Sequence, residues 1–265
     1  MLHIYVISLE RDTEKRKVIK ETLQGFNLNF SFINAIDGIT LPESQINLIR
    51  ERSVGTVASR GFPATAGEIG CTLSHVKAYH QVLEDNQIWA CILEDDVILD
   101  ERFKVFINTF QSTNMNSKDL YLMGGQYGLG IKYIIKSNRN INYIGGAAFH
   151  KTIRSQYLVQ RTCCYLISSA MAKKLLRLSQ ESFILADDWG YLSENKYINR
   201  IYLADFVEHP TDLSASNLQQ GREEATLRNP SKKIGYMNKL QNTLKCHIRY
   251  QILTAYKYIE RKDRV

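Results

Sequence analysis

Three carboxylates stand side by side at Glu94-Asp95-Asp96, directly after the apolar run Ile88–Leu93. Because like charges this close repel one another, we expect a positive group among them. Carboxylates suit Mg²⁺ or Mn²⁺, and such cations usually also bind phosphate groups of a substrate. The spacing can turn Glu94 and Asp96 one way while Asp95 turns another. The cluster therefore predicts a metal and phosphate site, with a solvated acidic turn as the alternative.

The residues around this cluster predict alternating strands and helices, and hence an α/β fold with a mainly parallel sheet flanked by helices. In such sheets ligands bind outside the carboxyl ends of the strands, where the acids stand. Apolar runs predict strands at Leu2–Ser8, Leu28–Ile36, Ile88–Leu93, Leu120–Met123, Cys163–Ile167 and Arg200–Val207. Helices are expected from Asp12 or Thr13 to Gln24, after Pro42, from Thr65 to Glu84, from Glu101, from Ser168 or Ser169 to Leu178, and over 188–195.

Three local patterns make sharper predictions. Thr65 with Glu68 three residues later predicts a capping box. The stretch Ser53–Pro63 is rich in turn formers and predicts a loop. The runs Lys132–Lys136 and Ile141–Ile144 predict an antiparallel hairpin that turns at 137–140.

The positive charge of the chain is concentrated at its end. The net charge is +7, and residues 231–265 alone carry nine basic and two acidic residues, so residues 1–230 are balanced. We predict a main domain over 1–230 and a basic amphipathic helix over 231–265, which either lies on an anionic membrane surface through 239–264 or docks on the domain. Its apolar residues recur at intervals of four or three: Leu240, Leu244, Ile248, Ile252, Tyr256 and Ile259.

Other classes of protein are disfavoured by composition. The five cysteines show no C-x-x-C or Cys/His spacing, which argues against a disulfide framework and a zinc site. The first residues lack a basic segment and a long apolar run, and no window of eighteen apolar residues follows. We expect a cytoplasmic protein, peripheral to the inner membrane. No nucleic-acid partner is expected, because such domains usually spread basic residues across a folded face.

Several segments, taken in order, resemble glycosyltransferase family 25, the bacterial lipopolysaccharide and lipooligosaccharide galactosyltransferases related to collagen galactosyltransferases. The most specific is GEIGCTLSHV at Gly67–Val76, and CILEDDVI at Cys91–Ile98 carries the acids. The others are IYVISLERDTEKR at Ile4–Arg16, NAIDG at Asn34–Gly38, CYLISSAMAKKLL at Cys164–Leu176 and ADDW at Ala186–Trp189.

The resemblance implies a GT-A type, Rossmann-like mixed sheet and an inverting enzyme. Such an enzyme moves a hexose, commonly galactose, from a UDP-sugar to a lipid-linked oligosaccharide of lipopolysaccharide or lipooligosaccharide. It implies Mn²⁺ or Mg²⁺ held by Glu94 and Asp96 against the diphosphate, where the cation neutralises the leaving group. Many metal-dependent GT-A enzymes place a late histidine on the metal, which makes His209 a candidate third ligand. This segment departs from the family pattern.

Further donor contacts are expected from residues beside the first strand and the acids. Ser8 ends the first strand, and Arg11 and Arg16 follow it, where arginine suits bidentate phosphate binding. Arg16 reads equally as a solvated helix residue. Asp95 is a candidate contact to ribose or the donor sugar. Ser74 and His75 are candidates for donor phosphates or the acceptor, and His75 reads equally as a packed core residue.

Inversion also needs a base that deprotonates the acceptor hydroxyl. Asp187 and Asp188 are the candidates, with Asp188 preferred, and the Trp189 ring is expected to form an acceptor platform. The alternative is that one of the two aspartates caps the helix over 188–195.

Two other functions remain open from the sequence. The same carboxylates fit another Mg²⁺-dependent phosphotransfer enzyme, which predicts no dependence on uridine. A non-catalytic module that binds anionic ligands through the basic tail predicts salt-sensitive binding and no effect of Asp96→Asn.

Overall fold

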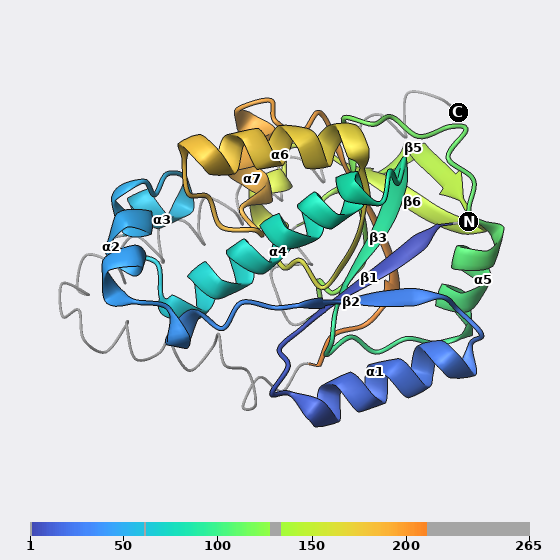
Figure 1. Ribbon diagram of the computed structural model, residues 1–265. Coiled ribbons are helices and arrows are strands. Elements are labelled where there is room, and N and C mark those ends of the chain that lie inside the picture. The colour runs from blue at the N-terminus through green and yellow to red at the C-terminus, as the bar shows by residue number, and fades with distance from the viewer. Residues whose placement is uncertain (1, 61, 128–133, 211–265) are drawn as a thin grey trace.

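Within residues 2–60, 62–127 and 134–210, which the computed structural model describes, eight strands form one sheet (Figure 1). The order across the sheet is β2-β1-β3-β7-β4-β8-β6-β5. The strands are β1 His3–Ser8, β2 Phe30–Asn34, β3 Trp89–Glu94, β4 Leu120–Gly124, β5 Lys136–Ile144, β6 Ala147–Thr152, β7 Cys164–Ser168 and β8 Ile201–Val207. The predicted tail over 231–265 lies outside the described residues.

The sheet is mixed, and its parallel part comes first in the chain. β1 pairs in parallel with both β2 and β3, so their carboxyl ends meet at one edge. β7 runs antiparallel between β3 and β4, while β4 and β8 are parallel. β6 and β5 complete the sheet as antiparallel strands. The predicted α/β class is confirmed, and the sheet is mixed, as the family resemblance implies, rather than mainly parallel.

Helices cover both faces of the sheet (Figure 1). One face is covered by α4, α6 and α7, and the other by α1 and α5. Two short helices, α2 and α3, pack near the start of α4. The helices are α1 Thr13–Gly25, α2 Glu43–Glu51, α3 Thr56–Ser59, α4 Ala66–Glu84, α5 Glu101–Thr109, α6 Ser169–Glu181 and α7 Trp189–Glu194, and short 3-10 turns lie at Gly38–Thr40 and Gln156–Leu158.

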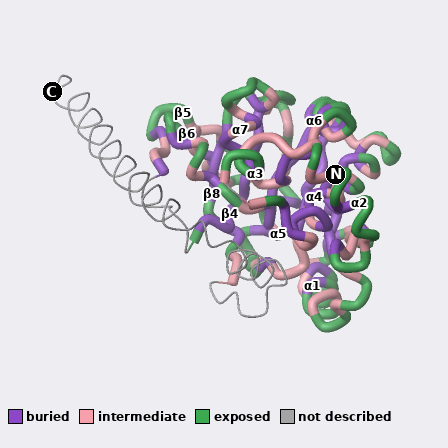
Figure 2. Tube along the Cα trace, turned by 90° about the vertical axis from the view of Figure 1, so that its left-hand side faces the viewer, coloured by how far each residue is buried: buried purple, intermediate pink, exposed green. Residues whose placement is uncertain are grey.

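Because both faces are covered, the central strands are buried along their length (Figure 2). Alternate residues of one strand enter different cores: Tyr5 and Ile7 pack under α4 and α6, whereas Ile4 and Val6 pack under α1 and α5. The same alternation directs the polar residues that end each strand. It turns Glu94, two residues after Ile92, toward the α4 face.

The predicted capping box begins α4 as expected. The Thr65 hydroxyl accepts the Glu68 N–H at 3.2 Å, and the Glu68 carboxylate accepts the Thr65 N–H at 2.9 Å. Arg60 adds an ion pair to the buried Glu68, with Nη2 2.6 Å from Oε2. This local network fixes where the long helix starts, and thereby the positions of Gly70 and His75 along it.

Two predictions of local structure are wrong. The segment Ser53–Pro63 is not only loop, because it holds α3 and a bridge between Ser53 and Phe183. The hairpin does not turn at 137–140: β5 continues to Ile144 and turns through Gly145-Gly146, both at positive φ, into β6. The turn formers at 137–140 instead make a bulge, where the Ser137 hydroxyl accepts the Arg139 and Asn140 N–H groups.

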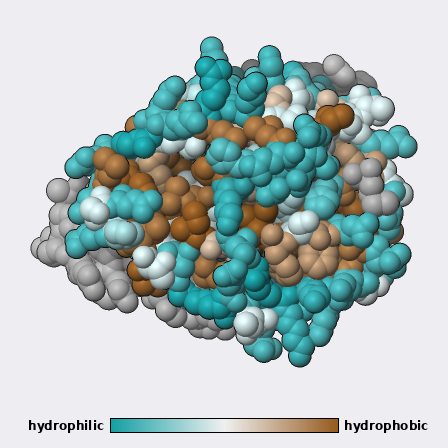
Figure 3. Space-filling model, viewed as in Figure 1, coloured by the Kyte–Doolittle hydropathy of each residue, from teal (hydrophilic) through white to brown (hydrophobic). Residues whose placement is uncertain are grey.

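The surface that carries α4 and α6 includes a large share of apolar side chains (Figure 3). A cavity of about 290 Å³ opens there, lined mainly by apolar residues of both helices and of segment 182–186. No helix in the described part of the chain is long and apolar enough to cross a membrane.

Candidate active site

The acidic cluster lies at the edge where the carboxyl ends of β1 and β3 meet. Glu94 ends β3, and Asp95 and Asp96 form the turn that follows. The Ser8 hydroxyl, at the end of β1, donates to Asp95 Oδ2 at 2.6 Å. Burial raises the pKa of Asp95 to about 6, although the Ser8 hydrogen bond and the charge of Lys15 oppose the rise. Ser8 and Asp95 are therefore bonded to each other rather than directed separately at a ligand.

Glu94, Asp96 and His209 form a compact cluster of oxygen and nitrogen atoms. One ligand atom from each lies within 4.8 Å of the other two. His209 follows β8, which lies three strands away from β3 in the sheet. It comes close to the acids because Ile98 and Glu208 pair through two backbone hydrogen bonds of 2.9 and 3.1 Å. The spacing thus turns Glu94 and Asp96 to one side and Asp95 to another, as predicted.

Two atoms of this cluster have the environment of cation ligands. Asp96 Oδ1 is buried, and no hydrogen-bond partner lies near it among the described residues. His209 Nδ1 lies 2.8 Å from the Pro210 carbonyl, which only accepts, so Nδ1 carries the proton and Nε2 points to Asp96 Oδ2 at 3.5 Å. Metal-binding histidines commonly hold their second nitrogen in this way. The described residues therefore fit a hard divalent cation.

The charges in this cluster are coupled. Burial alone would raise the pKa of Asp96, but the hydrogen bond and charge of His209, with Lys15, outweigh it and lower that pKa. Burial likewise opposes protonation of His209, and Asp96 outweighs it and raises the pKa of the imidazole. Without a cation, His209 and Asp96 compensate each other's charge.

His75 connects the acidic cluster to α4. Its Nε2 lies 3.4 Å from Glu94 Oε1, and its Nδ1 lies 2.8 Å from the Tyr165 hydroxyl. The ring is fully buried. The Thr162 hydroxyl donates to the same Glu94 oxygen. The structure thus supports the core alternative for His75, with one polar edge toward Glu94.

Ser74 is bonded within the fold, so its expected contact with donor phosphates or the acceptor stays a prediction that this arrangement does not favour. Its buried hydroxyl donates to the Gly70 carbonyl at 2.7 Å and accepts the Ile36 N–H at 2.8 Å. These bonds join two of the segments that carry the family resemblance, Asn34–Gly38 and Gly67–Val76. The backbones approach so closely that a Cβ on Gly70 would lie 2.5 Å from Gly38 N and Ile36 O.

The two arginines after β1 are engaged with residues around the end of β2. Arg11 forms an ion pair with Asp37, and its side chain is about half exposed. Arg16 Nη2 donates to Asn34 Oδ1 at 2.6 Å, and its guanidinium lies over the Phe32 ring, 4.6 Å from the centroid. Within the described part of the chain, neither guanidinium forms a hydrogen bond with the three acids. Their expected phosphate contacts remain a prediction.

Asp188 is held as a structural cap. Its Oδ1 accepts the Tyr191 N–H at 3.3 Å at the start of α7, and its Oδ2 accepts the Thr56 N–H at 2.7 Å. Its neighbour Asp187 is less buried, and its Oδ2 lies 3.4 Å from the Arg161 N–H. The capping alternative therefore applies to Asp188, so the structure shifts the preference for the base to Asp187.

Trp189 is no acceptor platform in this structure. Its ring is fully buried, packs edge-on against Tyr165 and donates Nε1–H to the Arg161 carbonyl at 2.9 Å. An apolar ring that opens a helix packed on the sheet contributes more free energy in the core than at the surface. The sequence alone does not distinguish these two positions.

Sequence reasoning missed three residues near the cluster. Lys15, in the first turn of α1, acts on both Asp95 and Asp96 through its charge. Thr162 bonds to Glu94, and Arg161 holds Asp187 while its Nη1 donates to the Gly125 carbonyl at 2.7 Å. The positive φ of Arg161 belongs to a turn that no side-chain pattern reveals. For Lys15 the sequence offered one signal, which is that it is a basic residue shortly after the first strand, like Arg11 and Arg16.

Arg161 and Thr162 also show how close the base candidate lies to the acids. They are neighbours in sequence, and one contacts Asp187 while the other contacts Glu94. Backbone dimensions then keep the two carboxylates within roughly 13 Å of each other. Both carboxylates therefore lie beside residues 161–162, near the carboxyl end of β3.

Comparisons with known proteins identify the family of this chain. The family model of "Glycosyltransferase family 25 (LPS biosynthesis protein)" matches residues 1–189. A Haemophilus influenzae protein named "Putative glycosyltransferase" is 28% identical over 254 residues, which cover 91% of this chain and 83% of that protein. Procollagen galactosyltransferase 1 of Danio rerio is 25% identical over 220 residues, which cover 80% of this chain and 34% of that longer protein.

Among solved structures, a glycosyltransferase involved in the glycosylation of the major capsid of PBCV-1 aligns over 85% of this chain and 98% of its own. Its TM-score is 0.42 and its identity 10%, and a similarity this weak carries no argument. The segment matched by the family model includes the three acids and Asp187, whereas His209 lies beyond it.

Proposed function

Because this chain belongs to glycosyltransferase family 25, we propose that it transfers a hexose from a UDP-sugar, with a divalent cation held by Glu94, Asp96 and His209. That the chain is a glycosyltransferase follows from the family; the donor, the cation and the acceptor are the proposal. The observation that carries it is Asp96 Oδ1, which is buried at the carboxyl edge of β1 and β3 with no hydrogen-bond partner in the described part of the chain, so that a cation would supply one.

The cation would be Mn²⁺ or Mg²⁺, since carboxylate oxygens and one imidazole nitrogen suit both. When bound, it supplies charge neutralisation for the diphosphate leaving group. The order of the strands supports a GT-A type sheet with the nucleotide at this edge, because ligands of open sheets bind outside the carboxyl ends of the strands. Lys15 adds a positive charge beside the site that can attract the phosphates.

Asp187 is the residue we propose as the base. It is less buried than Asp188 and neither caps α7 nor accepts the Thr56 N–H. Its Oδ2 would take the proton of the acceptor hydroxyl as that oxygen attacks the anomeric carbon, on the face opposite to the leaving UDP. The Arg161 N–H, 3.4 Å from the same oxygen, orients the carboxylate.

For the donor we propose UDP-galactose, and for the acceptor a lipid-linked oligosaccharide of lipopolysaccharide or lipooligosaccharide. The family description names LPS biosynthesis, and a relative is named a procollagen galactosyltransferase. The nine basic residues of 231–265 support an anionic membrane surface as the place of action. Removing residues 239–265 should then reduce sedimentation with anionic vesicles, and unchanged sedimentation would refute this part.

The proposal is tested by thermal unfolding with UDP and with UDP-galactose, each with and without Mn²⁺, followed by a transfer assay. A ligand at 100 times its Kd stabilises the protein by about 2.7 kcal/mol. We expect stabilisation by UDP that needs Mn²⁺, and a further rise with UDP-galactose over UDP-glucose. Stabilisation by UDP that is the same in EDTA would refute the metal site. Greater stabilisation by UDP-glucose than by UDP-galactose would refute UDP-galactose as the donor.

A further inference from the structure

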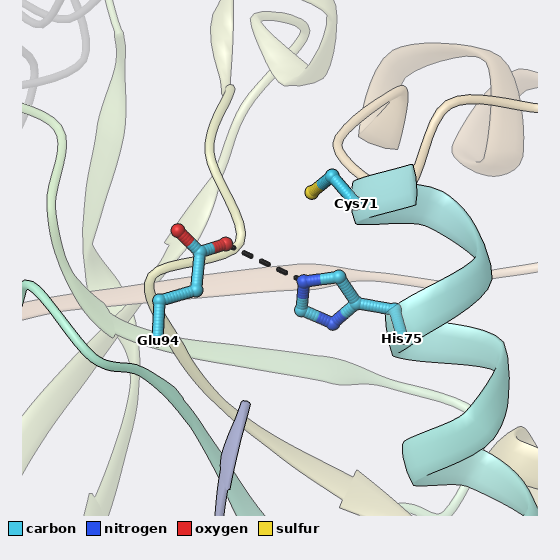
Figure 4. Close-up of side chains that lie close together, drawn as sticks. All are labelled: Cys71, His75 and Glu94. Atoms are coloured by element: carbon cyan, nitrogen blue, oxygen red, sulfur yellow. Dashed lines mark hydrogen bonds and ion pairs between the residues drawn. The ribbon is translucent and has the colours of Figure 1, made fainter. Parts of the chain in front are cut away.

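A thiol, an imidazole and a carboxylate converge beside the acidic cluster (Figure 4). Cys71 and His75 are four residues apart on α4, so their side chains share one side of the helix. Glu94 reaches toward them from the end of β3, and one ligand atom from each residue lies within 4.8 Å of the other two. This second cluster shares only Glu94 with the proposed donor-metal site.

These three groups are ligands of a thiophilic divalent cation. Zn²⁺ binds Cys sulfur at about 2.3 Å, His nitrogen at about 2.0 Å and carboxylate oxygen at about 2.1 Å, in a tetrahedron. Two nitrogen or oxygen ligands of such a tetrahedron stand roughly 3.4 Å apart. His75 Nε2 and Glu94 Oε1 already have that separation, 3.4 Å. The half-buried Cys71 places its Sγ within 4.8 Å of a ligand atom of each of the other two residues.

The surroundings hold two of the three ligands in place. The Tyr165 hydroxyl, itself 3.2 Å from the Tyr79 hydroxyl, engages His75 Nδ1 and leaves Nε2 directed at Glu94. The Thr162 hydroxyl fixes Glu94. Metal-binding histidines and carboxylates are typically oriented by such second partners. His75 and Glu94 are therefore held in position by neighbouring hydroxyl groups before any cation binds.

We propose that Cys71, His75 and Glu94 bind Zn²⁺ or another thiophilic divalent cation, and that this cation inhibits transfer. The inhibitory part rests on the proposed function, because Glu94 also belongs to the donor-metal cluster. A cation held at Cys71 competes for Glu94, and its charge repels a second divalent cation placed beside the same carboxylate. Mn²⁺ and Mg²⁺ prefer oxygen ligands and occupy the thiol site poorly.

The site is tested on the full chain without nucleotide. Cd²⁺, a spectroscopic substitute for Zn²⁺, should give a thiolate charge-transfer band at one equivalent. Cys71→Ser should remove the band and weaken Zn²⁺ binding at least about tenfold. Two matched controls should keep both: Cys246→Ser, outside the described residues, and His80→Gln, an exposed histidine of the same helix. Zn²⁺ should also protect Cys71 from alkylation, mapped by mass spectrometry.

An unchanged band in Cys71→Ser, or equal alkylation of Cys71 with and without Zn²⁺, would overturn the site. In a transfer assay at saturating Mn²⁺, Zn²⁺ should inhibit the wild type at concentrations at least about tenfold lower than those that inhibit Cys71→Ser. Equal inhibition of both proteins would place Zn²⁺ at Asp96 and refute the antagonism. If no protein transfers sugar, the proposed function and the inhibition both fail, while the band and the alkylation still decide the zinc site.

Discussion

The backbone N–H of Thr56 donates to Asp188 Oδ2 at 2.7 Å and so joins α3 to the start of α7 across 132 residues. The other carboxylate oxygen caps α7. Gly55, beside Thr56, has a positive φ, and a Cβ there would lie 2.5 Å from the same Asp188 oxygen. Asp188 therefore connects two segments that are far apart in sequence, and both oxygens of its carboxylate stabilise the fold by accepting backbone N–H groups.

Asp188→Ala should lower the free energy of unfolding by about 1–3 kcal/mol, because it removes a helix cap and leaves the Thr56 N–H without its acceptor. Denaturant titration measures this change. Glu194→Ala, an exposed acid at the end of the same helix, is the matched control and should change stability by less than about 0.5 kcal/mol. Equal effects of the two variants would contradict the capping role.

Asp187→Asn should lower kcat by at least about a hundredfold, because general-base catalysis contributes about 10²–10⁴-fold. Nucleotide affinity should stay unchanged, since the side chain does not belong to the acidic cluster. Asp188→Asn keeps an oxygen acceptor for one backbone N–H and is the comparison. If Asp188→Asn lowers kcat more than Asp187→Asn does, the base is Asp188 after all.

Asp96→Asn should abolish the stabilisation by UDP that depends on Mn²⁺, because it removes a charged ligand whose buried Oδ1 has no hydrogen-bond partner among the described residues. Thermal unfolding with and without Mn²⁺ measures the loss. Asp100→Asn is the matched control, because Asp100 is an exposed acid that caps α5 and pairs with Arg102, outside the acidic cluster. Full Mn²⁺ dependence in Asp96→Asn would show that the cation lies elsewhere.

Gly70→Ala should destabilise the protein by about 1–3 kcal/mol, because the new Cβ would overlap the backbone of Ile36 and Gly38. Gly25→Ala is the opposite case. A Cβ there meets nothing within 4 Å, so the variant should be neutral or stabilise by up to about 1 kcal/mol. A neutral Gly70→Ala would mean that α4 can move away from 36–38 without cost.

Tyr5→Phe should destabilise the protein in a pH-dependent way. The buried Tyr5 hydroxyl donates to Asp85 Oδ2 at 2.6 Å, and this bond, followed by one from Gln81, lowers the pKa of Asp85 below its usual 3.8. A lowered pKa stabilises the folded state above the unfolded pKa, and the contribution disappears as the pH falls through the folded pKa.

The loss in Tyr5→Phe should therefore be about 1 kcal/mol at pH 7, at the low end because Asp85 is exposed, and smaller below about pH 4. Chemical denaturation at several pH values measures it. In an Asp85→Asn background the effect of Tyr5→Phe should not vary with pH. A pH-dependent effect that persists there would assign it to another group.

Several features of the molecule follow from local sequence. The strands β1, β3, β4, β7 and β8 are short apolar runs that only a covered sheet can bury, and Thr65 with Glu68 marks the start of α4 through contacts three residues apart. The acids at 94–96 follow directly from the end of β3. These features depend on neighbours within a few residues, so the sequence alone predicts them.

Other features depend on which distant segments meet, and only the tertiary structure decides them. His209 reaches Asp96 because residue 98 pairs with residue 208. Cys71 and His75 stand four residues apart on one helix, a spacing that the prediction against a zinc site overlooked, but only the packing of α4 on β3 brings Glu94 to them. The cap that Asp188 Oδ1 gives to Tyr191 is local, but the bond from Thr56 to Oδ2 spans 132 residues. The burial of Trp189 likewise depends on a segment that is distant in sequence, because its Nε1–H donates to the Arg161 carbonyl 28 residues earlier. Local propensity carries no information about such contacts, because their free energy arises only when the sheet brings the segments together.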